Sequence, residues 1–120
     1  MNKYRIKIKP HVDEEVLIAN QAAGKGNYAK AFAHLERAHV LGQVSTFEHV
    51  RIHWLMFLWG ARQKNLREML GQIMRIVGAA TKTAVGFVPS GNTGGSNVSP
   101  FKKLPIPPDL AMKIQAARAD

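Results

Sequence analysis

Apolar residues recur every three or four positions through most of the first 80 residues, with polar residues between them. This spacing places the apolar side chains on one face of an α-helix. It predicts four helices, over residues 12–23, 27–41, 45–61 and 65–78, of which the third is apolar on most sides and should be central. The expected apolar faces are Val16, Leu17, Ala19, Ala22 and Ala23; Ala31, Leu35 and Ala38; Phe47, Val50, Trp54, Phe57 and Leu58, with Ile52, Leu55 and Trp59 on another side of the same third helix; and Leu66, Met69, Leu70, Ile73 and Ile76.

Capping residues stand at the ends of these predicted helices. Asn27, Ser45 and Asn65 each precede a helix, where a side-chain oxygen can accept a backbone N–H. Glu68 follows Asn65 by three residues, which is the carboxylate position of a capping box. Gly42 ends the second helix near the position where glycine is favoured. The turns between the helices are therefore short, and we expect neighbouring helices to be antiparallel.

The two ends of the chain follow a different pattern. Residues 1–11 alternate bases with Tyr4, Ile6 and Ile8 and reach Pro10, so we expect an extended basic arm. Residues 79–108 are rich in glycine and proline, and a short helix is predicted at 108–118. The predicted organisation is an arm at 1–11, a four-helix core at 12–80 and an irregular tail at 81–120. Apolar residues should pack this tail on the core: Val85, Phe87, Val88, Val98, Phe101, Leu104 and Ile106.

The second and fourth helices are weakly repeated at an offset of 38 residues. The pattern Asn27-Tyr28-x-x-Ala31-x-x-x-Leu35-x-x-Ala38 aligns with Asn65-Leu66-x-x-Met69-x-x-x-Ile73-x-x-Ile76. The first unit, GNYAKAFAHLERAHVLGQ, resembles the second half of a tetratricopeptide repeat. The expected fold is all-α: two tetratricopeptide-like helix hairpins, a long packed Gly/Pro-rich tail and a short C-terminal helix. Two units are fewer than a free solenoid needs, so the array is either capped by the tail or forms a homodimer.

Composition narrows the function classes. The chain has 120 residues, no cysteine and a net charge of +9, so disulfides, thiolate metal sites and thiol nucleophiles are excluded. Its longest apolar run is too short to span a bilayer, and the N-terminus has no apolar stretch typical of a signal peptide. We therefore expect a cytoplasmic protein with no membrane partner. The bases are scattered and aromatic residues lie mostly among apolar ones, so we do not expect a nucleic-acid partner.

Four residues carry the candidate chemistry: Glu36, His39, His49 and His53. Glu36 and His39 share a face of the second helix, and His49 and His53 share a face of the third. If these helices fold antiparallel about a turn at 42–45, all four residues lie at similar positions along the helix axes. Carboxylate and imidazole groups between helices commonly hold metal, here zinc, iron, manganese, nickel or copper. His34 points away from His39 and is excluded.

Structural roles are the alternative for these residues. His49 could bond a turn carbonyl, His53 could be a satisfied core histidine, and Glu36 could pair with Arg37 or Lys30 on the surface. The sequence offers no general base or nucleophile to assign, so it does not predict an enzyme.

A second candidate feature is the loop Gly91-Asn92-Thr93-Gly94-Gly95. Such residues tolerate positive φ and can direct successive N–H groups inward to bind an anion or another ligand. The spacing of a nucleotide phosphate loop is absent, and the alternative is a tight packing loop. If it serves the site, it should close over the histidines or pack behind them.

Several strings together resemble the small bacterial proteins grouped as domain of unknown function 3703. They are LERAHVLGQ at 35–43, HVRIHW at 49–54, EMLGQIMRI at 68–76, GNTGG at 91–95 and LPIPPDL at 104–110. The resemblance covers residues 12–112 and includes Glu36, His39, His49 and His53. It implies no established activity, but it implies an association with bacterial metal resistance.

Three functions follow from the sequence. The first is binding of a transition metal or small ligand through Glu36, His39, His49 and His53. The alternative is a repeat-like protein-interaction module with a structural histidine cluster, whose partner is unknown. A basic nucleic-acid-associated protein is the second alternative.

Overall fold

The chain folds as five α-helices in a computed structural model that describes residues 3–85, 90–99 and 102–119. They are α1 (Lys3–Gly24), α2 (Tyr28–Gly42), α3 (Thr46–Arg62), α4 (Leu66–Val85) and α5 (Pro108–Arg118). The described residues contain no strand. The all-α prediction of four helices followed by a short C-terminal one is therefore confirmed.

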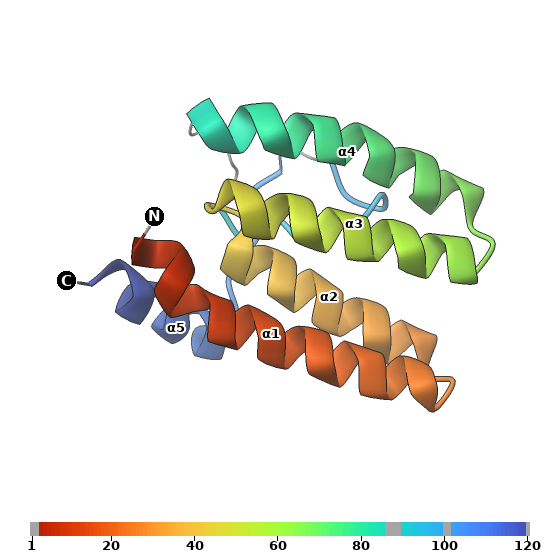
Figure 1. Ribbon diagram of the computed structural model, residues 1–120, viewed down its shortest axis with the longest axis horizontal. Coiled ribbons are helices and arrows are strands. Elements are labelled where there is room, and N and C mark those ends of the chain that lie inside the picture. Colours follow the sequence, from red (N-terminus) through yellow and green to blue (C-terminus); the bar gives the residue numbers. More distant parts are fainter. Residues whose placement is uncertain (1–2, 86–89, 100–101, 120) are drawn as a thin grey trace.

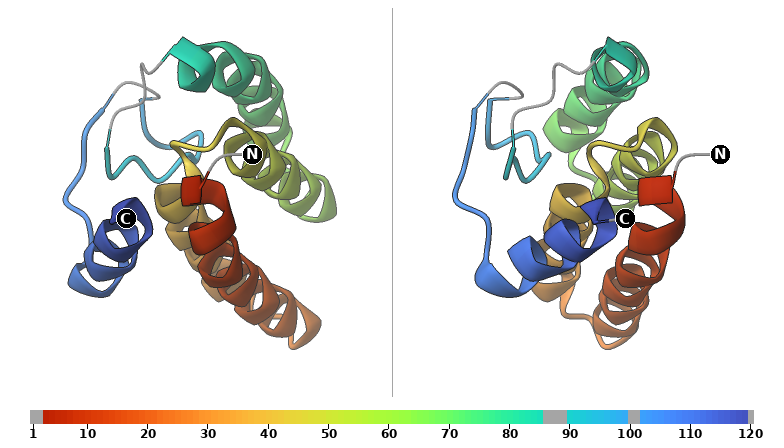
Figure 2. Two further views of the ribbon diagram at one scale, coloured as in Figure 1. Left: turned by 60° about the vertical axis from the view of Figure 1, so that its left-hand side comes forward. Right: turned by 90° about the vertical axis from the view of Figure 1, so that its left-hand side faces the viewer.

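Two antiparallel hairpins form the body of the molecule (Figure 1). α1 packs against α2, α3 packs against α4, and α2 and α3 join the two hairpins. Figure 2 shows residues 90–99 and 102–107 on one side of the hairpins, followed by α5, which packs on α1 and α2. The central helices of the fold are therefore α2 and α3, which carry the four candidate residues.

The predicted caps fix the starts of three helices. Asn27 accepts the Lys30 N–H at 3.1 Å, and Ser45 accepts the Glu48 N–H at 3.4 Å. Asn65 accepts the Glu68 N–H at 3.0 Å, so it caps α4 as expected. The carboxylate of Glu68 completes no capping box and instead reaches the tail, as described below.

The expected extended arm at 1–11 is wrong for residues 3–11, which form the first turns of α1. Ile8 and Val12 are fully buried, Tyr4 donates to the Leu41 carbonyl at 2.7 Å, and Arg5 pairs with Glu48 at 3.1 Å. Burial raises the pKa of Tyr4 to about 12. These contacts outweigh the loss of one helical hydrogen bond at Pro10, which lies inside the helix.

The expected inner face of α4 is wrong for three of its five residues, whereas Met69 and Ile76 are partly buried. Leu66, Leu70 and Ile73 are about half exposed or more, whereas Glu68 and Gln72 are buried. α4 continues to Val85, beyond the predicted end at 78 and into the stretch expected to be tail. On α3, the expectation of a helix buried on most sides is wrong for Phe47 and Trp54, which are exposed.

The described part of the tail packs on the core. Leu110 is fully buried, and Ile106 packs against the core cluster. Arg37 of α2 forms ion pairs with Glu15 of α1 and Asp109 of α5. Phe87, Val88 and Phe101, which we expected to pack, lie outside the described residues, as does the side chain of Val85. No helix among the described residues has the length and apolar character to cross a membrane.

Candidate functional site

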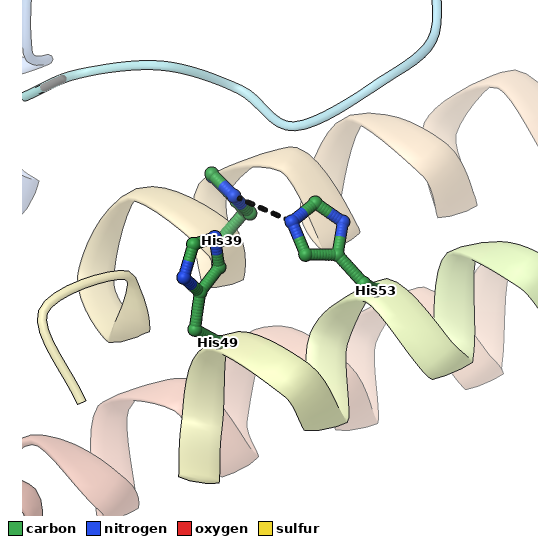
Figure 3. A group of neighbouring side chains, drawn as sticks. All are labelled: His39, His49 and His53. Carbon is green, nitrogen blue, oxygen red and sulfur yellow. Dashed lines mark hydrogen bonds between the residues drawn. The ribbon is translucent and has the colours of Figure 1, made fainter. Parts of the chain in front are cut away.

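Three histidines meet between the two hairpins. His39 comes from the last turn of α2, and His49 and His53 come from successive turns of α3. All three are buried, and one nitrogen from each lies within 4.8 Å of the others. Figure 3 shows the rings converging on one space between the two helices. The sequence-based prediction that these three residues come together is confirmed.

The His39 ring connects this cluster to the tail. Its Nδ1 lies 2.6 Å from the carbonyl oxygen of Asn92, which can only accept, so Nδ1 carries a proton. Its Nε2 lies 3.2 Å from Nε2 of His53. The Asn92 carbonyl thus sets both the orientation and the tautomer of the ring.

A polar chain holds His53 from the other side. Its Nδ1 lies 2.6 Å from Oε1 of Gln72. The Gln72 amide nitrogen donates to Oε2 of Glu68 at 2.6 Å and to the Gly94 carbonyl at 2.9 Å. Both of these partners accept, so the amide oxygen faces His53, and His53 must donate from Nδ1.

The environment disfavours a positive charge on His39. Burial lowers the pKa of His39 well below its usual value, and the nearby His53 and His49 lower it further. The positive charge of Arg75 acts in the same direction, while the hydrogen bond to Asn92 opposes it. His39 is therefore a neutral imidazole at neutral pH.

These hydrogen bonds turn the Nε2 atoms of His39 and His53 toward one another. A neutral ring that donates from Nδ1 has its lone pair at Nε2. Two nitrogens bound to one tetrahedral zinc at 2.0–2.1 Å are about 3.3 Å apart. The observed 3.2 Å between the Nε2 atoms of His39 and His53 is close to that separation. The two nitrogens are therefore spaced as two ligands of one metal ion are.

Glu36 lies outside this group of nitrogens. Burial raises the pKa of Glu36, and the charge of Glu68 adds to the rise, while a hydrogen bond from Thr93 opposes it. Glu36, Thr93 and Leu104 line a surface pocket of about 430 Å³ between α2 and the tail. The predicted carboxylate is therefore on the tail side of α2, on the same helix as His39 but facing the loop.

The loop 91–95 lies directly against His39. A Cβ added to Gly94 would stand 2.5 Å from Cδ2 of the His39 ring, and Gly94 has φ +85°. A Cβ on Gly91 would meet the Leu104 carbonyl at 1.8 Å, and one on Gly95 would meet Asn97 and Phe32. The side chain of Asn92 bonds the carbonyls of Ser99 and Lys102 at 2.8 and 2.7 Å. The glycines allow the tail backbone to approach the ring.

The polar groups of this loop bind acceptors from the chain itself. Gly94 N–H donates to Asn92 Oδ1 at 2.9 Å, and Ser96 N–H donates to the Glu68 carboxylate at 3.2 Å. Ser96 Oγ lies 3.3 Å from the same carboxylate. The anion beside this loop is therefore the buried Glu68 side chain.

Sequence reasoning missed Glu68 and Gln72 as parts of the site. Glu68 was assigned to a cap, and Gln72 lies between the apolar residues that were expected to face inward. The available signal was the i, i+4 spacing of an acid and an amide within an apolar helix, which places both on one face. His34, excluded from the site, lies outside the cluster and contacts Glu15 at 2.7 Å.

Comparison with known proteins finds one family. A model of a protein family of unknown function, DUF3703, matches residues 6–114, which include the histidines, Glu68, Gln72 and the loop 91–95. No curated protein and no solved structure matches the chain. The match covers most of the chain, and the protein belongs to the family grouped as domain of unknown function 3703.

Proposed function

We propose that this protein binds a divalent transition-metal ion through His39, His49 and His53. The observation that carries the proposal is the convergence of three buried histidine nitrogens from two hairpins within 4.8 Å. Imidazole groups brought together in the core by facing helices are a common arrangement of metal ligands in helical bundles.

The surrounding hydrogen bonds support this reading. Histidine ligands usually donate their second ring nitrogen to a carbonyl or carboxylate, which fixes the tautomer and strengthens the ligand. His39 does so to the Asn92 carbonyl, and His53 does so to the Gln72 amide oxygen. Gln72 is itself anchored by the Glu68 carboxylate. Each of the two rings is thus set to present Nε2.

The donor set favours particular metals. Imidazole nitrogens suit zinc, copper, iron and nickel, whereas manganese prefers oxygen ligands. The ligands proposed here are neutral, and Glu36 belongs to the pocket beside the loop rather than to the metal ligands. Among the metals expected from the sequence, we therefore place zinc, nickel, copper and iron before manganese.

The test is the metal content of tag-free protein after incubation with zinc and removal of excess ion. We expect near-stoichiometric zinc in the wild type and loss of it in a His49→Ala/His53→Ala variant. Two controls should retain zinc: Glu36→Gln, in the neighbouring pocket, and His34→Ala, a histidine outside the cluster.

Circular dichroism distinguishes loss of ligands from loss of fold. A folded wild type that retains no zinc, nickel, copper or iron contradicts the proposal. Equal metal in the wild type and the folded double variant contradicts it as well. Loss of zinc in Glu36→Gln would return that carboxylate to the ligand set.

A further inference from the structure

The outer side of α4 carries an apolar stripe formed by Leu66, Leu70, Ile73 and Val77. These side chains are 49–65% exposed, and the neighbouring Met74 is 75% exposed. Their spacing is that of a buried helix face, yet among the described helices α4 packs against α3 only. The stripe therefore has the pattern of an interface, and no helix in the described part of the chain covers it.

The spacing of the stripe residues reads the same in both directions along the helix. Its members are separated by four, three and four residues, which is the spacing of the core positions in paired helices. Against an antiparallel copy of α4, Leu66 meets Val77 and Leu70 meets Ile73. The two-fold axis passes between Leu70 and Ile73, and each contact occurs twice, as in an isologous dimer.

We propose that this chain forms a symmetric homodimer in which the apolar stripes of two α4 helices pack antiparallel. A single stripe that complements itself needs no second protein with a matching pattern. The proposal is independent of metal binding, because the stripe lies on the opposite side of α4 from Gln72 and Glu68.

Charge permits a second copy to approach over this face. The chain carries +9, so two copies repel each other over most surfaces. Two charged residues of α4 are directed at the tail: Glu68 bonds Ser96, and Arg75 bonds the Val98 carbonyl at 2.6 Å. Arg67 is exposed beside the stripe, where it would stand at the rim. An acidic partner helix would have few bases to pair with here.

The exposed apolar area of the stripe is that of a weak, reversible dimer. With on the order of 100 Å² for each half-exposed large side chain, covering the four side chains of the stripe and the neighbouring Met74 buries about 1,000 Å² over both copies. That is the lower bound for a biological interface and lies in the range of transient ones.

The first test is the mass in solution by sedimentation velocity over a range of concentrations. We expect about twice the chain mass of 13.3 kDa for the wild type. Leu70→Glu/Ile73→Glu should be monomeric, because it places four carboxylates in the interface. Leu17→Glu on α1 is the matched control, since Leu17 and Leu70 are exposed to nearly the same extent, and it should remain dimeric.

The second test uses the absence of cysteine from the chain. A Leu70→Cys variant should form a covalent dimer rapidly on mild oxidation, because Leu70 lies beside the two-fold axis and close to Leu70 of the second copy. Leu17→Cys on α1, which is exposed to nearly the same extent, should not. A wild type that stays monomeric at high micromolar concentration overturns the proposal. So does a dimer that survives Leu70→Glu/Ile73→Glu, or equal cross-linking of the two cysteine variants. Adsorption of a monomeric wild type to anionic vesicles would identify the stripe as a lipid contact instead.

Discussion

Gly94 determines how closely the tail approaches the candidate metal centre. Its α-carbon packs on the ring of His39, and its carbonyl accepts from Gln72 at 2.9 Å. The composition of the loop predicted unusual backbone angles, and φ +85° at Gly94 agrees with it. Which side chain the loop would touch could not be predicted, because that depends on how the tail crosses α2 and not on local sequence.

We expect Gly94→Ala to destabilise the protein by about 3 kcal/mol, from backbone strain and from the clash with His39. It should also weaken zinc binding by about 10-fold or more, because His39 must turn or shift. Gly26→Ala is the matched control: Gly26 has φ +78° but open space around its Cβ position, so only strain of about 1–2 kcal/mol is expected. Urea unfolding and zinc competition measure both effects. Equal losses in the two variants would show that the contact with His39 is unimportant.

At the scale of elements, the N-terminal turns of α1 belong to the core. The local pattern there is typical of an extended segment, because bases alternate with Tyr4, Ile6 and Ile8 and Pro10 follows. Burial of Ile8 and Val12 against the other helices overrides that local pattern. For α4 the prediction fails in the opposite direction, because Glu68 and Gln72 are buried whereas the apolar stripe faces outward. Local periodicity locates a helix but does not say which neighbour its faces meet.

Ile8→Ala should therefore lower the free energy of unfolding by about 3 kcal/mol, since it leaves a cavity in a fully buried position. Ile6→Ala removes the same atoms from a side chain that is more than half exposed, and it should cost less than about 0.5 kcal/mol. Urea denaturation of both variants measures the difference. If the two substitutions had the same small effect, residues 3–11 would not be part of the folded core.

For the whole molecule, the histidine cluster joins three parts of the chain. His39 comes from the first hairpin, His49 and His53 come from the second, and Asn92 comes from the tail. The heights of the three histidines could be calculated from helix geometry and one short turn, so this part was predictable from sequence. The buried partners Gln72 and Glu68 could not be predicted, because the way α4 packs against α3 decides which face of α4 is turned toward the site.

Burial of a neutral His39 makes the stability of the metal-free protein depend on pH. The pKa of His39 is lowered well below 6.5, so below that pH the unfolded chain binds a proton that the folded chain does not. Unfolding is then favoured, and stability falls as the pH drops from about 6.5 toward the folded-state pKa, by up to about 1.4 kcal/mol per pH unit for this one proton. At pH values above the pKa of histidine in the unfolded chain, the full contribution of neutral His39 to stability is present.

Urea unfolding in chelator between about pH 7.5 and about pH 5 measures this slope. In His39→Gln, the unfolding free energy should change less steeply with pH, by the contribution of about one bound proton. His11→Gln, which removes a histidine outside the cluster, should not show this change. Zinc should stabilise the wild type most at the higher pH, because protons compete with the metal for the same nitrogens. Identical slopes for the wild type and His39→Gln would mean that His39 is not held neutral in the fold.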